Sequence, residues 1–260
     1  FFFQSLPSLK HNCLPSDRLS ATMVQSLNAA ALKTLTTLLL RPSLTVPHLS
    51  VPSVSCIDYA SLRRHAGIRA IAFDKDNTLT APYDELLHPL ARNGLQEALA
   101  TFGVENVAIL SNSAGTLDDP GGKDADAIEK KLGIAVIRHQ TKKPGGLEEV
   151  LSHFGLTDPA EVCMVGDRLL TDIVFGNLYG MMTIHVLPLC TGADNAKDNT
   201  IAKVLRSVEN KVLYGEWFGG RMLRRRGTTP HKIWKGTPSL STGEFTFLGE
   251  ITENGVKKSI

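Results

Sequence analysis

Two aspartates separated by a single residue, Asp74 and Asp76, directly follow a short apolar segment at residues 68–73. A short apolar run bounded by polar residues predicts a buried strand, and open parallel sheets carry their active sites at the carboxyl ends of strands. Two carboxylates in that place can divide the work of phosphoryl transfer. Asp74 would attack phosphorus, while Asp76 would protonate the leaving oxygen and later activate water. The pair alone is a weak indication, because the same spacing also occurs in solvated loops.

Three further polar groups follow predicted strands and strengthen this interpretation. After the strands expected at 106–110, 134–138 and 161–165 come Ser111 and Asn112, Lys142 and Lys143, and Asp167 and Asp172. The carboxyl ends of neighbouring parallel strands meet at one edge of a sheet. The sequence therefore predicts one site to which four separate segments contribute.

The acidic members of this set predict a magnesium site. Mg²⁺ prefers oxygen ligands in octahedral geometry and keeps several waters. Such ligands would come from Asp74, the carbonyl of Asp76, Asp167 and Asp172. The cation would offset the repulsion between a carboxylate nucleophile and an anionic phosphoryl group. Which of Asp167 and Asp172 binds it directly, and which acts through water, the sequence leaves open.

The remaining polar residues suit phosphate binding. Ser111 offers a hydroxyl to a phosphoryl oxygen, and Asn112 can support it through its amide or the adjoining backbone. Thr78 belongs to the same predicted phosphate-binding group, where it would orient Asp76 or the loop rather than react. Lys143 is expected to provide a fixed positive charge for catalysis, with Lys142 as the alternative.

Strands and helices alternate along the central part of the chain. A fifth strand is expected at 182–187, and helices are expected at about 86–102, 123–132, 145–154 and 169–179. This alternation predicts an α/β fold, a Rossmann-like parallel sheet with helices on both faces. The connections have room for one helix and its loops, so no large cap domain is expected. An uncapped cleft suits a phosphate on a bulky molecule; alternatively, the neighbouring subunit of a homo-oligomer would cover it.

Composition and charge divide the 260 residues into three predicted parts, 1–57, 58–218 and 219–260. The contents of 42% hydrophobic and 21% charged residues are ordinary for a soluble globular protein. The first part contains one acidic residue, Asp17, many Ser and Thr, and an amphipathic pattern, which predicts an organelle-targeting segment or, alternatively, a docking arm. No apolar run reaches the roughly 18 residues of a membrane span, so membrane contact is expected to be peripheral.

The third part is a basic extension. Six of its eight Lys and Arg residues cluster around Trp234: Arg221, Arg224, Arg225, Arg226, Lys232 and Lys235. Basic charge combined with aromatic side chains suits an anionic membrane surface or a nucleic acid. A solvated tail would have the same composition.

Four extended motifs resemble those of the haloacid dehalogenase (HAD) phosphatases, and more closely those of its mitochondrial phosphatidylglycerophosphatase branch. They are Phe-Asp-Lys-Asp-Asn-Thr-Leu at 73–79, Leu-Ser-Asn-Ser-Ala-Gly at 110–115, Arg-His-Gln-Thr-Lys-Lys-Pro-Gly at 138–145 and Val-Gly-Asp-Arg-Leu-Leu-Thr-Asp-Ile at 165–173. The resemblance implies a HAD-like fold, Mg²⁺ as cofactor and the site roles given above. It also favours Lys143 over Lys142. In this superfamily an acid two positions after the nucleophile, here Asp76, is typical of phosphatases and less often of phosphomutases.

The resemblance further implies hydrolysis of phosphatidylglycerophosphate to phosphatidylglycerol, the step before cardiolipin. It places the enzyme peripherally on the matrix side of the mitochondrial inner membrane, with an anionic phospholipid as substrate and no nucleic acid partner. Two alternatives remain open. One is a phosphatase of soluble phosphomonoesters or phosphoproteins, and the other is a non-catalytic HAD scaffold that binds membranes.

Overall fold

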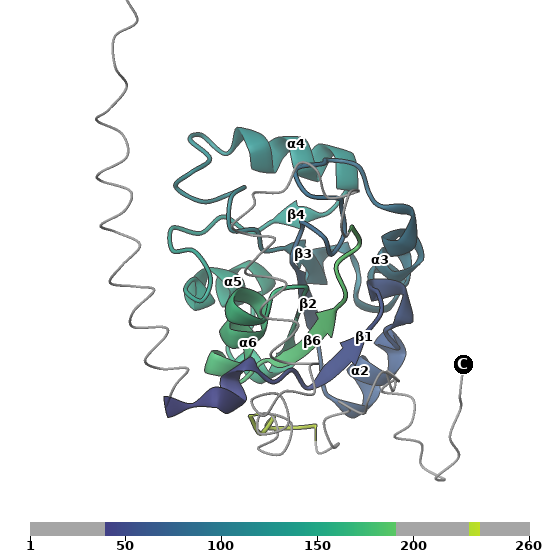
Figure 1. Cartoon of the computed structure of the whole chain (residues 1–260), viewed down its shortest axis with the longest axis vertical. Helices are drawn as coiled ribbons and strands as arrows, with labels where there is room; N and C mark the ends of the chain where they lie inside the picture. Colours follow the sequence, from purple (N-terminus) through teal and green to yellow (C-terminus); the bar gives the residue numbers. More distant parts are fainter. Residues whose placement is uncertain (1–39, 191–228, 235–260) are drawn as a thin grey trace, which may run out of the picture. The chain divides into compact units, whose positions relative to one another are not determined.

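The computed structural model describes residues 40–190 and 229–234, and the unit that carries the sheet begins at Pro42. Its six strands all run parallel in the order β1-β6-β5-β2-β3-β4 (Figure 1). Their bounds are β1 Leu49–Val51, β2 Ala70–Phe73, β3 Val107–Ile109, β4 Ala135–Val136, β5 Val162–Gly166 and β6 Met182–Val186. The predicted parallel α/β fold is confirmed.

The bounds of the helices are α2 Tyr59–His65, α3 Pro89–Phe102, α4 Lys123–Leu132, α5 Leu147–Phe154 and α6 Val174–Tyr179. Four of these helices follow the expected alternation, whereas α2, which precedes β2, was not predicted. The helix expected at 169–179 begins as a π-helical turn, η5 Leu169–Ile173, before α6. Within the described residues, the connections after β2 and β3 hold α3 and α4 with their loops and no large cap domain, as predicted.

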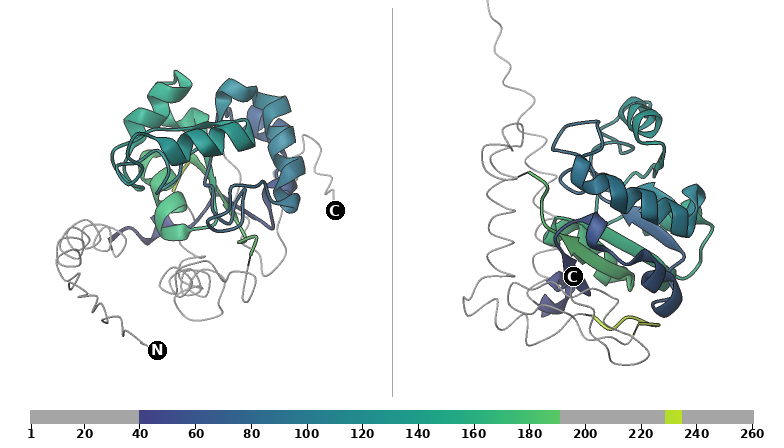
Figure 2. Two further views of the ribbon diagram at one scale, coloured as in Figure 1. Left: turned by 90° about the horizontal axis from the view of Figure 1, so that it is seen from above. Right: turned by 90° about the vertical axis from the view of Figure 1, so that its right-hand side faces the viewer.

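Two apolar cores lie on opposite faces of the sheet, because side chains along a strand alternate between faces. In β2, Ile71 and Phe73 belong to the core beneath α2, α3 and α4, whereas Ala70 and Ala72 belong to the core beneath α5 and α6. Figures 1 and 2 show these helices as layers on either side of the sheet.

The strand order places a crevice at the centre of the sheet. From β2 the chain continues to β3 and β4 on one side, and then crosses to β5 and β6 on the other. The carboxyl ends of β2 and β5 therefore lie next to each other where the connections diverge. Open α/β sheets bind ligands at such a point.

The structure differs from the expected boundary between residues 57 and 58. β1 pairs with β6, with Leu49 opposite Ile184, and Tyr59 in α2 is fully buried. A three-residue strand containing Ser50 carries too little periodicity to be recognised from sequence. The folded unit therefore includes Pro42–Ile57.

Part of the expected C-terminal extension also packs on this unit. Trp234 is only 5% exposed and belongs to the core, and a ring nitrogen of His231 lies 3.0 Å from the carbonyl of Ala160. Lys232 pairs with Asp158. Trp234 is thus buried rather than available to a membrane surface.

Several expectations lie outside the described residues. These are the amphipathic segment before Leu40, the arginine cluster at 221–226 and any structure at 235–260. Among the residues that are described, no helix has the length and apolar content needed to cross a bilayer.

Candidate active site

Asp74 lies where β2 ends, at the central crevice. Its backbone N–H donates to the carbonyl of Val165 in β5 at 2.8 Å, which continues the pairing of the two strands by one residue. Asp167, the residue after β5, is fully buried on the neighbouring strand end. The sheet thus brings together two carboxylates that are far apart in the sequence.

Lys143 joins Asp74 to a third carboxylate, that of Asp172. Its ammonium donates to Asp74 Oδ1 at 2.7 Å and to Asp172 Oδ1 at 2.6 Å, and the lysine side chain has no exposed surface. Asp172 belongs to the π-helical turn η5, and its Oδ2 accepts the backbone N–H of Arg168 at 3.1 Å. Lys143 rather than Lys142 therefore contacts the predicted nucleophile, because Lys142 instead pairs with Asp118.

The acidic cluster fits a hard divalent cation. One ligand atom from each of Asp74, Asp167 and Asp172 lies within 4.8 Å of the others, and all three residues are buried. With Lys143 protonated, the four side chains carry a net charge of −2 when every carboxylate is ionised. Buried carboxylates at this density require compensating charge, and carboxylate oxygens are the ligands that Mg²⁺ prefers. The residues present therefore fit the predicted metal.

Neighbouring residues fix the ligand geometry. A Cβ atom added at Gly166 would collide with the carboxylate of Asp172, so only glycine allows this close approach. The backbone carbonyl of Asp167 accepts a hydrogen bond from His185 Nε2 at 3.0 Å. Burial lowers the pKa of His185 to about 4, so the imidazole is neutral at physiological pH and its protonated nitrogen faces this carbonyl.

Burial and neighbouring charges shift the pKa values of Asp74 and Lys143 in opposite directions. Burial raises the pKa of Asp74 above its usual value, although the ammonium of Lys143 pulls it down. Burial would also lower the pKa of Lys143, but the carboxylates of Asp172 and Asp74 outweigh it and leave this pKa raised. Lys143 consequently remains cationic at neutral pH.

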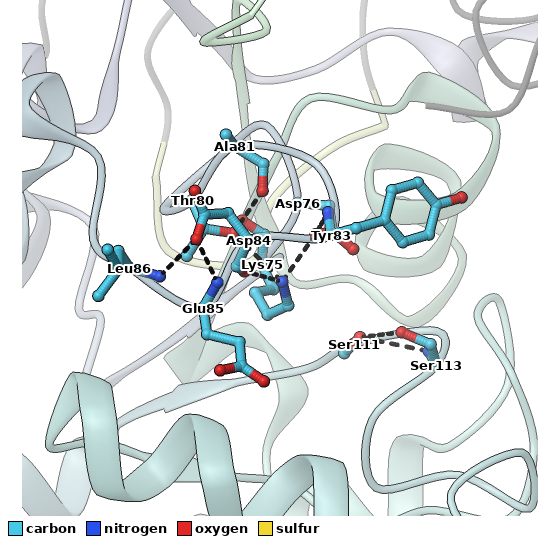
Figure 3. A network of polar contacts seen from close by, with 10 residues as sticks. All are labelled: Lys75, Asp76, Thr80, Ala81, Tyr83, Asp84, Glu85, Leu86, Ser111 and Ser113. Atoms are coloured by element: carbon cyan, nitrogen blue, oxygen red, sulfur yellow. Dashed lines mark hydrogen bonds and ion pairs between the residues drawn. The ribbon is translucent and has the colours of Figure 1, made fainter. Parts of the chain in front are cut away.

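Asp76 lies in a separate polar network, drawn in Figure 3. Its Oδ1 accepts hydrogen bonds from Lys75 Nζ at 2.7 Å and from the backbone N–H of Tyr83 at 3.0 Å. Lys75 is buried and also donates to Thr80 Oγ1 at 3.2 Å and to the carbonyl of Asp84 at 2.7 Å. These bonds tie the second aspartate to the loop that follows it.

A cavity of about 190 Å³ opens above the two aspartates. Asp74, Asp76, Ser111 and Asn112 contribute to its wall. The other lining residues are Pro82, Tyr83, Ser113, Asp118, Lys142, Arg168 and Thr171. The sequence-predicted groups after β2 and β3 therefore share one cavity with cationic side chains.

Asn112 and Thr78, two of the predicted phosphate-binding residues, have surroundings that the sequence did not predict. The side-chain oxygen of Asn112 accepts the backbone N–H of Lys143 at 2.9 Å, so this residue positions the lysine segment as well as lining the cavity. Thr78 is 1% exposed and does not line the cavity. Among the described residues its buried hydroxyl has no hydrogen-bond partner, so the orienting role of Thr78 stays a prediction.

Sequence reasoning did not find Lys75, Tyr83 or Gly166. A lysine between two aspartates looks like a solvated residue, and its burial depends on the loop that folds over it. Tyr83 has a left-handed backbone with φ 57°, which is unusual for a bulky residue and cannot be inferred from its type. The glycine at the end of β5 was the one detectable signal, because glycine within a strand often marks a close approach.

The fold and site define an α/β protein with a carboxylate–lysine centre at the carboxyl edge of a parallel sheet. The family model described as mitochondrial PGP phosphatase matches residues 28–188. The chain belongs to this family, as its motifs suggested.

The names of related proteins agree with this family. Over 154 residues the chain is 47% identical to "Phosphatidylglycerophosphate phosphatase 1, chloroplastic" of Chlamydomonas reinhardtii, covering 58% of this chain and 56% of the relative. An Arabidopsis thaliana protein of the same name, designated chloroplastic/mitochondrial, is 42% identical over 65% of this chain and 47% of its own length. A mitochondrial phosphatidylglycerophosphatase of Saccharomyces cerevisiae is 37% identical over 57% of this chain and 81% of its own length. The match thus spans about half the length of the first two relatives.

Proposed function

We propose that the chain is a Mg²⁺-dependent phosphatase that hydrolyses phosphatidylglycerophosphate to phosphatidylglycerol, the precursor of cardiolipin. The observation that carries this proposal is the contact of Lys143 with both Asp74 and Asp172 beside Asp167. The substrate assignment is supported by the family and by the names of its relatives. The family description and the mitochondrial designations of the Arabidopsis and yeast relatives, together with the acid-poor N-terminal segment, support a mitochondrial location. The matrix side of the inner membrane is part of the proposal.

In the proposed reaction, a carboxylate oxygen of Asp74 attacks phosphorus and forms an aspartyl-phosphate. Asp76 donates its proton to the departing glycerol oxygen as the P–O bond breaks. Asp76 then accepts a proton from water, whose oxygen attacks phosphorus, releasing phosphate and restoring Asp74. Bound Mg²⁺, held by Asp74, Asp167 and Asp172 with the Asp76 carbonyl, would neutralise charge on the phosphoryl group.

The chain's other residues orient these groups. Lys143 holds Asp74 in place and keeps positive charge beside the phosphoryl site. The Ser111 hydroxyl lies in the cavity wall, where it can donate to a phosphoryl oxygen. Because phosphoryl transfer depends mainly on positioning and charge neutralisation, these contacts account for most of what the protein must provide.

A substrate panel tests the proposal. We expect phosphate release from phosphatidylglycerophosphate to require Mg²⁺ and to proceed with a higher kcat/KM than release from glycerol 3-phosphate or a phosphoserine peptide. Equal or better turnover of the soluble substrates would favour a broad phosphatase instead. A metal-loaded protein without turnover of any substrate would indicate a non-catalytic scaffold.

Lys75 is expected to act through Asp76. Replacing Lys75 by Met removes three donated hydrogen bonds and loosens the Asp76 carboxyl group, whose protonated form is the proposed donor to the leaving oxygen. General-acid catalysis contributes roughly 10²–10⁴-fold, and it matters most when the leaving group is basic. We therefore expect kcat/KM, which reports the steps up to departure of the leaving group, to fall about tenfold or more for an alkyl phosphate and to change little for p-nitrophenyl phosphate.

Asp76→Asn is the matched reference for this experiment, because its kcat/KM should show the same dependence on the leaving group. Its kcat should fall with every substrate, since Asp76 also activates the water that hydrolyses the aspartyl-phosphate. Circular dichroism and melting curves of both variants check that the fold persists. An equal loss with both substrates would show that Lys75 supports the fold of the site rather than the acid.

A further inference from the structure

Exposed apolar side chains are concentrated in the segments after β2 and β3. Among the described residues from Pro42 onward, six large apolar side chains are exposed. Four of the six lie in the loops after these strands or in the first turn of α3: Tyr83, Leu86, Leu90 and Leu117. Single exposed apolar residues are common on protein surfaces, but their gathering at one end needs an explanation.

Two of these residues adjoin the proposed active site from different loops. Tyr83 is 62% exposed, lines the cavity, and donates its backbone N–H to Asp76. Figure 3 shows its ring extending away from the Lys75 network. Leu117 is 76% exposed and precedes Asp118, which lines the same cavity. Tyr83 thus borders the cavity itself, and Leu117 is the chain neighbour of a residue that borders it.

The loop that carries Leu117 is held in a defined conformation. Asp119 accepts backbone N–H groups of Gly115, Asp124 and Ala125, each at 3.0 Å. Exposure of a leucine side chain to water is unfavourable, and an anchored loop keeps the side chain exposed unless a partner covers it. Because the next residue, Asp118, lines the cavity, the geometry points to a partner that comes with the substrate.

The cavity is too small to hold acyl chains. Pockets for drug-sized ligands usually measure about 300–1,000 Å³, whereas this cavity measures about 190 Å³ and carries Asp74, Ser111 and Arg168 on its wall. It suits a phosphorylated head group. A diacyl lipid whose phosphate reached Asp74 would leave its chains outside, next to the entrance.

We propose that Tyr83 and Leu117 seat the entrance of this cavity in the interfacial region of a bilayer that contains anionic phospholipids. This inference rests on the proposed lipid phosphatase function. Tyrosine is favoured at membrane interfaces because its ring is apolar and its hydroxyl remains hydrated. Arg168, which lines the same cavity, offers positive charge to an anionic head group, whereas Lys142 is paired with Asp118. The surface brings the phosphate to Asp74 without extraction of the lipid.

The test compares one lipid in two physical states. Wild type, Leu117→Ser and Leu117→Trp are assayed on long-chain phosphatidylglycerophosphate in phosphatidylcholine–phosphatidylglycerol vesicles, and on a short-chain analogue kept monomeric. We expect Leu117→Ser to lose about fivefold or more of kcat/KM on vesicles, since the leucine no longer buries apolar area, and to keep its activity on the monomer. Leu117→Trp should retain vesicle activity, because tryptophan is favoured at interfaces.

Val104→Ser is the matched control. Val104 is 58% exposed but lies in η3, Val104–Asn106, before β3 and hence at the opposite end of that strand. Equal vesicle activity of Leu117→Ser and Val104→Ser would contradict the proposed contact of Leu117 with the bilayer. Analytical ultracentrifugation provides a second check. If wild type is a dimer and Leu117→Ser is a monomer, Leu117 lies in a subunit interface and the membrane proposal is wrong. If wild type hydrolyses neither form of the lipid, the proposed function itself fails.

Discussion

Asp74→Asn is expected to abolish turnover, with a fall in kcat on the order of 10⁴-fold or more, the scale seen when a nucleophile is removed. The amide cannot form the aspartyl-phosphate, and no other described carboxylate both lines the cavity and contacts Lys143. Rapid quenching with radiolabelled substrate should detect a phosphoenzyme in wild type and none in the variant. Residual turnover within tenfold of wild type would contradict covalent catalysis by Asp74.

The fold of this variant is expected to survive, which makes the result interpretable. Burial raises the pKa of Asp74, so the folded state already resists its ionisation, and a neutral amide of the same shape removes that cost. The amide oxygen can still accept from Lys143. Asp118→Asn, which changes an exposed cavity residue paired with Lys142, is the control and should keep most activity.

The sequence predicted the strand–helix alternation because the core strands are continuous apolar runs. Val162, Met164 and Val165 in β5 are fully buried, and such strands are recognisable without knowledge of their neighbours. The polar residues after these strands were detectable because they stand at the point where each apolar run ends. Once the strands are parallel, their carboxyl ends must meet, so the convergence of Asp74 and Asp167 followed from topology alone.

The features that the sequence did not predict depend on tertiary contacts, which leave no local pattern in the sequence. β1 is held by its pairing with β6 rather than by periodicity. Trp234 looked like a surface residue because its neighbours are basic, yet it packs into the core. Lys75 is buried by a loop whose conformation requires Tyr83 at positive φ. In each case a long-range contact overrides what the residue type suggests.

Lys143→Met is expected to reduce both stability and activity, and Mg²⁺ should restore part of the stability. Removing the buried ammonium leaves Asp74 and Asp172 without their cationic partner, and breaking a buried ion pair typically costs about 3–5 kcal/mol. We expect a matching fall in the free energy of unfolding when the metal is chelated. Activity should also fall, by about 100-fold, because positioned charge provides most of the catalysis in phosphoryl transfer.

The metal dependence separates an electrostatic role of Lys143 from a packing role. A cation that binds only the folded protein raises its stability in proportion to its affinity, and the variant cluster is one charge more negative. Mg²⁺ should therefore raise the melting temperature more in Lys143→Met than in wild type. Lys142→Met should behave like wild type, because its exposed pair with Asp118 contributes about 0–1 kcal/mol. Equal Mg²⁺-induced increases in all three proteins would place the metal away from Lys143 and remove the electrostatic basis of the proposed site.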